Sequence, residues 1–443
     1  MTVSSSRCKF PGRAASLQSG IFPTDGRRRT HRCQFLAAAL LLLFSTAGCS
    51  EEQVATAPVL SWYIFDEPSG SFAEAARSCS NASGGEYLID IVVLPADADQ
   101  QREQLVRRLA ARDSAIDIIG LDVIWTAEFS AAGWIIPWPE GLADAVTEGR
   151  LGSAVESATF DGRLQAAPFT TNTQLLWYRT DRVRTPPDTW DKMIELAESL
   201  GDKGAIQVQG ERYEGLTVFF NSLLASAGGS ILNEQGIEIE LEQAATEQAL
   251  RVMHRLATSP AAPASLSTSR EDQCRLAFES GDSSFMVNYT FVWPSARQNA
   301  PQVAENMGWA RWPAVIPGRP SRVTIGGINL GVGAYSKNPG PAFAAAACLA
   351  SEANQRLAAA KGGLPPTIAS LYRDEEVRRV FPFADLLLET LSSGVQRPQT
   401  PLYNDISLAV SHTLHPMRAI EPEKDVRRLR DKIERALRSE GLL

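Results

Sequence analysis

The chain has 443 residues, of which 44% are hydrophobic and 21% are charged, fractions that are ordinary for a globular protein and exclude extensive disorder. Its net charge of −8 argues against nucleic acid and anionic lipid headgroups as partners, because both are polyanions that an acidic protein repels. The length exceeds that of one ordinary domain and predicts two lobes.

The first residues have the layout of a secretory signal. Arginines between Arg27 and Arg32 precede an apolar run at residues 35–44, and small residues then lead to Cys49. This run is too short for a permanent membrane helix, which needs about 20 residues, but it suits a signal. The small residues before Cys49 resemble a bacterial lipobox, so we expect residues 1–48 to be a lipoprotein signal peptide and the Cys49 thiol to carry lipid. Plain signal cleavage near the same place is the alternative.

Loss of this leader would remove seven basic residues and one acidic residue, which makes the net charge −14. Residues 49–58 would form a short polar and Ala/Pro tether. No later apolar run approaches the roughly 20 residues that a spanning helix needs, so lipid is the only membrane contact that we expect.

Three cysteines follow Cys49, namely Cys79, Cys274 and Cys348. In an oxidising compartment this odd number predicts one disulfide and one free thiol. His412 and His415 are close in sequence, but no cysteine or further histidine lies near them. We therefore expect no metal site and no cofactor.

Strands and helices alternate after the tether. Residues 59–64 are predicted as a buried strand, and apolar residues recur at helical spacing between residues 72 and 79. A strand at residues 89–94, a helix at residues 100–111 and a strand at residues 116–119 follow. This alternation predicts the α/β class, with a mostly parallel sheet and helices on both of its faces.

A second block of the same kind begins with a predicted strand at residues 175–178. The helix predicted at residues 190–200 has Thr189 as its N-cap, directly after two prolines and an aspartate. Strand and helix thus alternate here as well, which predicts a second sheet flanked by helices.

Two later segments have the pattern of a chain that returns to an earlier sheet. Residues 323–332 are predicted as a strand that contains Gly326 and Gly327, and the alanine-rich residues 342–350 as a helix. The glycine pair can mark a bulge or a tight packing point. It can equally mark a backbone that is kept bare for a ligand, and the pattern alone leaves both readings open.

Four motifs resemble those of the extracytoplasmic sugar-binding proteins of ABC importers. Residues 167–179 resemble the first crossover between the lobes of that family, and residues 278–286 resemble its F-x-x-G helix-to-strand turn. Gly326-Gly327 is similar to the return strand, and residues 362–366 are similar to the loop beyond it. Each motif alone is weak, but four in this order are specific, and together they cover essentially the whole expected mature chain.

Further segments look like one subgroup of that family, the trehalose-binding lipoproteins of the LpqY type. These segments are residues 122–129, 170–179 and 397–403, whereas the loop at residues 65–70 departs from the subgroup pattern and leaves the exact sugar open. The resemblance implies a two-lobed periplasmic-binding-protein-like fold, in which a multi-crossover hinge joins the lobes and the ligand is held between them.

Each lobe is expected to combine two parts of the chain: residues 59–166 and 323–380 for lobe 1, and residues 167–322 and 381–443 for lobe 2. In this arrangement Cys79 and Cys348 share lobe 1, while Cys274 lies in lobe 2. A bridge across the lobes would oppose hinge motion, so we expect a Cys79–Cys348 disulfide and a free Cys274 thiol.

A neutral sugar offers hydroxyl groups and weakly apolar C–H faces, so its site needs carboxylates, amides and aromatic rings. The residues expected to bind the ligand are Glu67, Asp122, Asn172, Tyr289, Trp293, Gly327 and Arg397. Glu67 and Asp122 follow the first and third predicted strands, where open α/β sheets bind their ligands. For each of the two carboxylates, a helix N-cap or an ordinary loop position is the alternative.

Asn172 can both donate to and accept from a hydroxyl group, although an Asx-turn would also explain it. The ring of Tyr289 or Trp293 could form a platform beneath the sugar, but aromatic residues are more often part of a core. Arg397 lies in a predicted loop, where its guanidinium could bridge sugar oxygens and lobe carboxylates. A solvated surface arginine is its alternative.

The expected function is a lipid-anchored solute-binding protein at the extracytoplasmic face of the cell membrane. It would act as a monomer, capture a disaccharide such as trehalose, and deliver it to the permease subunits of an ABC importer, with no catalytic residue. A secreted glycoside hydrolase for a related α-glucoside is one alternative, since carboxylates are abundant. A structural or adhesion lipoprotein is another, but it would not require polar and aromatic residues at strand ends.

Overall fold

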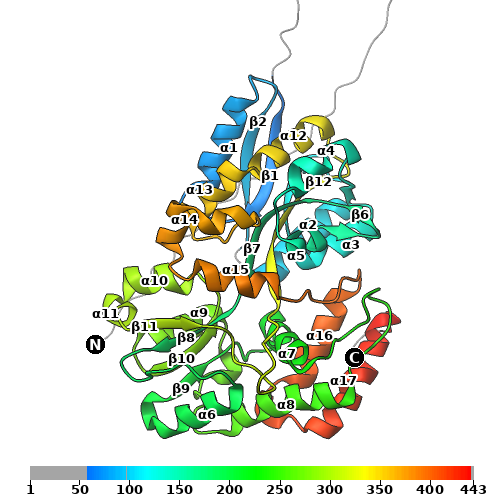
Figure 1. Cartoon of the computed structure of the whole chain (residues 1–443). Helices are drawn as coiled ribbons and strands as arrows, with labels where there is room; N and C mark the ends of the chain where they lie inside the picture. Colours follow the sequence, from blue (N-terminus) through cyan, green and yellow to red (C-terminus); the bar gives the residue numbers. More distant parts are fainter. Residues whose placement is uncertain (1–56, 96, 441–443) are drawn as a thin grey trace, which may run out of the picture. The chain divides into compact units, whose positions relative to one another are not determined.

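The computed structural model describes residues 57–95 and 97–440 (Figure 1). The predicted signal peptide, Cys49 and most of the predicted tether lie outside the described residues. Among the helices that are described, none is both long enough and apolar enough to cross a membrane.

The first sheet has six strands in the order β2-β1-β3-β12-β4, with β7 paired to β12. Its strands are β1 (Val59–Phe65), β2 (Leu88–Leu94), β3 (Ile118–Asp122), β4 (Ile135–Ile136), β7 (Ala167–Thr173) and β12 (Ile325–Gly333). β1 runs parallel to β2 and β3, whereas β12 runs antiparallel to β3, β4 and β7. A strand from late in the chain therefore lies in the middle of this sheet.

Alternating residues of β1 face the two layers of helices around this sheet. Trp62 belongs to the core on the side of α1 (Ser71–Ala82) and α12 (Pro339–Leu349), and Tyr63 belongs to the core on the side of α2 (Ala98–Ala110) and α3 (Thr126–Ala131). The alternation follows from the two-residue period of a strand. The other helices and short strands of this part are α4 (Glu140–Thr147), α5 (Gly152–Ser157), α13 (Glu352–Gly362), α14 (Glu375–Val380), β5 (Thr159–Phe160) and β6 (Arg163–Leu164).

A disulfide joins α1 to α12. Cys79 and Cys348 are bonded to each other, and Cys274 is a buried free cysteine, so the predicted pairing is confirmed. The Asn354 side-chain amide donates to the Cys348 carbonyl at 2.8 Å and adds a contact from α13.

The second sheet has four strands in the order β11-β8-β10-β9. They are β8 (Leu175–Arg179), β9 (Ala205–Gln207), β10 (Ser283–Asn288) and β11 (Met307–Ala310). β8 runs antiparallel to β10 and β11, and β9 runs parallel to β10. Figure 1 shows this sheet in the lower part of the view, below the first one.

Two sets of helices cover the second sheet. The core on one face includes residues of α6 (Trp190–Ser199), α7 (Glu214–Ala227), α8 (Gln243–Thr258), α16 (Tyr403–Leu414) and α17 (Pro422–Leu437). The core on the other face includes residues of α9 (Glu271–Glu279), α10 (Val292–Asn299), α11 (Pro301–Ala304) and α15 (Ala384–Ser392). Thr189 caps α6 as predicted, because its side chain accepts a hydrogen bond from the Lys192 amide.

The predicted α/β class is confirmed, but the predicted mostly parallel pairing is wrong. Among the described strands of the two main sheets, only the pairs β1–β2, β1–β3 and β9–β10 are parallel. An apolar pattern shows that a strand is buried, but it does not show the direction in which the chain enters the sheet. β12 follows the second sheet in the chain and enters the first sheet in the reverse direction. The exact lobe boundaries stay a prediction.

Candidate functional site

Asp122 and Arg397 meet where the two sheets approach each other. Asp122 is the last residue of β3, and its Oδ1 accepts a hydrogen bond from the Ile124 amide in the following 3-10 turn. Arg397 comes from the segment between α15 and α16, and its Nη2 lies 3.4 Å from the same Oδ1. The side chain thus links the end of β3 to the segment between α15 and α16.

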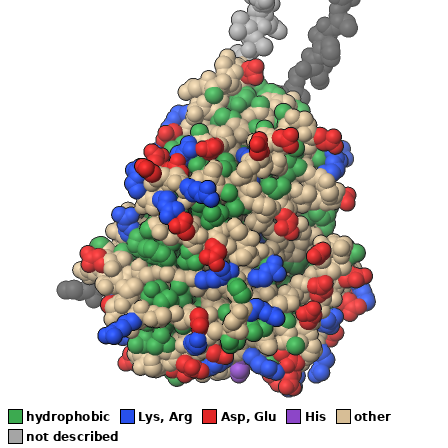
Figure 2. All heavy atoms as spheres, in the orientation of Figure 1, with side chains coloured by type: hydrophobic (Ala, Val, Ile, Leu, Met, Phe, Trp, Pro, Cys, Tyr) green, Lys and Arg blue, Asp and Glu red, His purple; other side chains and the backbone are tan. Residues whose placement is uncertain are grey.

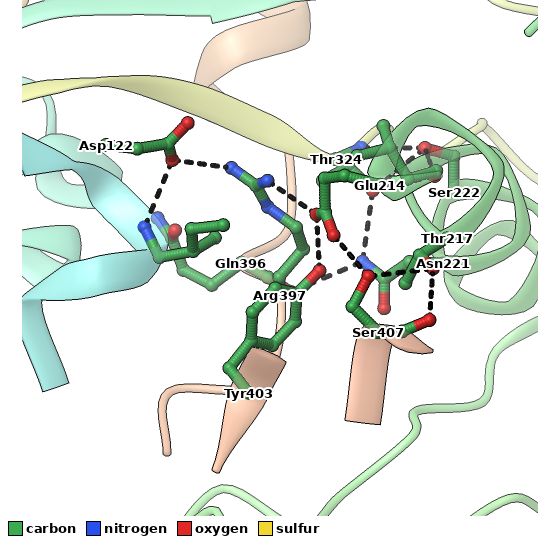
Figure 3. A network of polar contacts seen from close by, with 12 residues as sticks. Asp122, Glu214, Thr217, Asn221, Ser222, Thr324, Gln396, Arg397, Tyr403 and Ser407 are labelled. Atoms are coloured by element: carbon green, nitrogen blue, oxygen red, sulfur yellow. Dashed lines mark hydrogen bonds and ion pairs between the residues drawn. The ribbon is translucent and has the colours of Figure 1, made fainter. Parts of the chain in front are cut away.

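Glu214, the first residue of α7, holds the other end of the guanidinium. Arg397 Nη1 donates to Glu214 Oε1 at 2.8 Å, and Figure 3 shows the guanidinium between the two carboxylates. Arg397 is only 7% exposed. Burial by itself would lower the pKa of Arg397, but the charge of Asp122, together with Tyr403 and Glu214, raises it above its ordinary value. The guanidinium is therefore a permanent buried cation.

One nitrogen of this guanidinium makes no hydrogen bond within residues 57–95 and 97–440. Among the described residues, the buried Nε of Arg397 has no hydrogen-bond partner. A buried donor without a partner costs about 1–3 kcal/mol, so an oxygen of a ligand or of water is expected to accept from it.

Two hydroxyl groups of α16 complete the network around Glu214. Tyr403 Oη donates to Glu214 Oε1 at 2.5 Å, and Ser407 Oγ donates to Glu214 Oε2. Burial raises the pKa of the Tyr403 hydroxyl far above its ordinary value, so this group stays a neutral donor. Arg397, Tyr403 and Ser407 therefore all donate to one carboxylate.

A cavity of about 400 Å³ lies beside this network. Its wall includes Arg102, Trp125 and Glu128 from the side of the first sheet, and Glu214 and Tyr403 from the side of the second. This volume lies within the range of small-molecule sites, about 300–1,000 Å³. Arg102 and Glu128 are already paired through two hydrogen bonds, at 2.7 and 2.5 Å, so their charges largely compensate each other.

A second ion-pair group also connects the two parts. Arg270 lies 3.2 Å from Asp97, which caps α2, and 2.8 Å from Glu211, which shortly precedes α7. The guanidinium lies over the ring of Tyr213, 4.6 Å from its centroid. Basic side chains thus contact acidic groups of both parts at two separate places.

Glu67 lies in the loop before α1, the second of the alternatives that the sequence left open. Its carboxylate accepts from the amides of Ser69 and Ser71 at 2.9 and 2.8 Å, and from the Ser71 hydroxyl at 2.6 Å, at the start of α1. Partial burial would raise the pKa of Glu67, but the hydrogen bonds from Ser69 and Ser71 outweigh it and lower the pKa. Much of the acceptor capacity of this carboxylate is therefore used within the protein.

Asn172 and Gly327 lie on the neighbouring strands β7 and β12, where Gly326 is opposite Asn172 and Gly327 is opposite Thr171. A Cβ on Gly327 would lie 2.2 Å from the Thr170 carbonyl oxygen, and its φ is +143°. Close packing of the two strands thus accounts for this glycine. The buried Oδ1 of Asn172 has no partner within the described part of the chain.

Comparison with known proteins adds an independent observation. Residues 85–356 match the family of bacterial extracellular solute-binding proteins. The chain belongs to this family. A solute-binding protein of this family acts outside the cytoplasm, in agreement with the expected location.

Several relatives of this solute-binding protein are known. A Deinococcus radiodurans protein named "Probable ABC transporter-binding protein" is 29% identical over 396 residues, which cover 86% of this chain and 92% of the relative. The maltose-bound MalE3 of T. maritima has a TM-score of 0.76 and 25% identity, over 85% of this chain and 99% of that one. A Thermotoga lettingae solute-binding protein with bound alpha-D-tagatose has a TM-score of 0.75 and 19% identity, over 86% and 100% of the two chains. The predicted periplasmic-binding-protein-like fold is confirmed.

The two aromatic candidates of this solute-binding protein differ in their surroundings. Tyr289 directly follows β10. Burial, and then the charge of Glu271, raise the pKa of its hydroxyl group. The charges of Arg397 and Asp122 also affect this pKa. Tyr289 is thus within electrostatic range of the Arg397 network. Trp293 lies in α10 and packs edge to face against Trp309, with ring centroids 5.3 Å apart, so it belongs in large part to an aromatic core.

Glu214 and Ser407 were missed in the sequence analysis, and Tyr403 was quoted there only within a motif. Glu214 looks like an ordinary acidic residue in the first turn of a helix, and Ser407 looks like one polar position of an amphipathic helix. Nothing in their local pattern shows that the two helices point these side chains at one arginine. The described residues contain no group of side chains that could hold a metal ion, and His412 and His415 are no exception.

Proposed function

We propose that this solute-binding protein is the sugar-binding component of an ABC importer, and that it captures a disaccharide, with trehalose as the first candidate. The observation that carries the proposal is the buried Arg397, which joins Asp122 of the first sheet to Glu214 of α7 beside a cavity of suitable size. The Deinococcus relative carries the name of an ABC transporter-binding protein, and the T. maritima structure contains maltose, which support this class of ligand.

The chemistry of the site suits a neutral polyol. Arg397 Nε is a donor in need of an acceptor, and Asn172 Oδ1 is an acceptor in need of a donor, so a hydroxyl group can satisfy either one. Asp122 adds a carboxylate oxygen, and the ring of Tyr289 is the preferred platform for an apolar sugar face. Because these groups come from both sides of the cleft, the ligand favours the closed state through its differential contacts.

The ligand and the membrane contact follow from the same proposal. Figure 2 shows acidic and basic side chains interspersed over the face in view, which fits an uncharged ligand better than a polyanion. A lipid on Cys49 would keep the protein, as a monomer, beside the permease subunits that receive the sugar, with no other membrane contact and no nucleic acid. The glycoside hydrolase alternative is not favoured, because the relatives described above are binding proteins.

Calorimetry across disaccharides tests the proposal. The parent protein should bind trehalose or another disaccharide and return it intact, and the ligand should raise the melting temperature because only the folded state binds it. Asp122→Ala and Asn172→Ala should weaken binding by about 5- to 150-fold, the effect expected for one lost polar partner. A parent protein that hydrolyses the sugar, or that binds no sugar at all, would refute the proposal.

A further inference from the structure

The two ion pairs of Arg397 are unequal. Nη1 lies 2.8 Å from Glu214 Oε1, a strong charge-assisted contact, whereas Nη2 lies 3.4 Å from Asp122 Oδ1, beyond the usual range of about 2.7–3.2 Å. Arg397 is therefore fixed on the side of α7 and only loosely attached to the first sheet. Any exchange of partners on ligand binding is easier at the Asp122 end.

The Glu214 carboxylate is itself held rigidly. It begins α7, a helix in which every residue from Gly215 to Ala227 is buried, and its negative charge lies at the positive end of the helix dipole. Tyr403 and Ser407 donate to its two oxygens. Ser407 is tied in turn to Thr217, one turn further along α7, with the two hydroxyl oxygens 3.1 Å apart.

From this geometry we propose that Glu214 is a positioning residue for ligand binding, which fixes the direction of the Arg397 guanidinium. Both Glu214 oxygens accept from protein donors, so the carboxylate is committed to the Arg397 network even though its side chain borders the cavity. Arg397, by contrast, has its Nε unused and its Asp122 contact weak. The inference rests on the proposed function and adds to it the group that orients the central arginine.

Two replacements of Glu214 distinguish orientation from simple stability. Glu214→Ala removes every acceptor, and sugar affinity should fall on the order of 10- to 100-fold because the guanidinium loses its fixed direction. Glu214→Gln keeps one carbonyl acceptor for Arg397 and should recover most of that loss. Parent-like affinity in the Ala variant would overturn the proposal.

Asp425→Asn is the matched control. Asp425 is 1% exposed and also pairs with an arginine, since its Oδ1 lies 2.8 Å from Arg428 Nη1, but it is in α17 and away from the cavity lining. Both Asp425→Asn and Glu214→Ala should lower the melting temperature, whereas only Glu214→Ala should lower sugar affinity. An equal affinity loss in the two variants would show that Glu214 acts through general stability alone.

A double-variant cycle and a crystal structure complete the test. Tyr403→Phe should weaken binding in the parent but add nothing in the Glu214→Ala background, because Tyr403 acts on the missing carboxylate. A full additional loss there would contradict the proposal. The sugar-free crystal structure of Glu214→Ala should show Arg397 turned away from its parent direction, and an unmoved guanidinium would overturn the inference. This last readout needs no ligand, so it separates failure of the positioning role from failure of the proposed function.

Discussion

Removal of the Cys79–Cys348 disulfide should cost the protein several kcal/mol of stability. The two residues are 269 positions apart, so the bond closes most of the described chain into one loop. The chain-entropy relation gives about 5.6 kcal/mol at 25 °C for a loop of this length, and native disulfides typically contribute about 2–5 kcal/mol. We therefore expect Cys79→Ala/Cys348→Ala to lower the free energy of unfolding by about 3–5 kcal/mol.

Urea unfolding followed by tryptophan fluorescence measures this loss. Cys274→Ala is the control, because it removes a buried sulfur without opening a covalent loop. Sugar affinity should stay within about twofold of the parent, since α1 and α12 cover the same sheet and the bond does not cross the cleft. The reasoning is refuted if the double variant loses no more than twice what the Cys274→Ala control loses.

Three further predictions concern single residues. Gly327→Ala should lower the free energy of unfolding by about 3 kcal/mol, because the new Cβ would clash with the Thr170 carbonyl and the backbone there has a positive φ. Gly340→Ala is the control and should be nearly neutral, because open space surrounds Gly340. Equal melting temperatures of the two variants would contradict this prediction. The pKa of Glu67 is lowered in the folded state, so its stabilisation is complete above the ordinary pKa of 4.5 and is lost as pH falls through the lower folded pKa. Glu67→Gln should flatten that acid-side decline in melting temperature, and an unchanged pH profile would count against it. Cys49→Ala should release the protein from cell membranes into the medium, and a variant that remains in the membrane fraction would disprove the lipid anchor.

Much of the fold could be predicted from the sequence because the apolar patterns are local. The strands at residues 59–64 and 175–178 and the Thr189 cap appear close to where they were expected, within a residue or so at each end. The Cys79–Cys348 pairing followed from the lobe assignment that the resemblance implied. Strand direction could not be predicted, because β12 obtains its antiparallel neighbours from the path of the whole chain.

The site was less accessible to sequence reasoning. Asp122 and Arg397 were found through their places at a strand end and in a motif, and the structure brings them together. Glu67 was expected at the ligand, but the amide and hydroxyl of Ser71 at the start of α1 already donate to its carboxylate. Glu214 could not be predicted, because its partners Arg397 and Tyr403 lie more than 180 residues later in the sequence.

The place of β12 has a consequence for synthesis of the protein. β12 lies between β3 and β4 in the first sheet, yet it is made only after every strand of the second sheet. Until residue 333 is available, β3 and β4 have no common neighbour, and β3 presents an unpaired edge that invites association with other chains. The second sheet needs no strand from beyond Ala310, so it can complete first. Folding during synthesis would thus trap a half-built sheet, whereas a chain that is kept unfolded until β12 is present avoids this hazard.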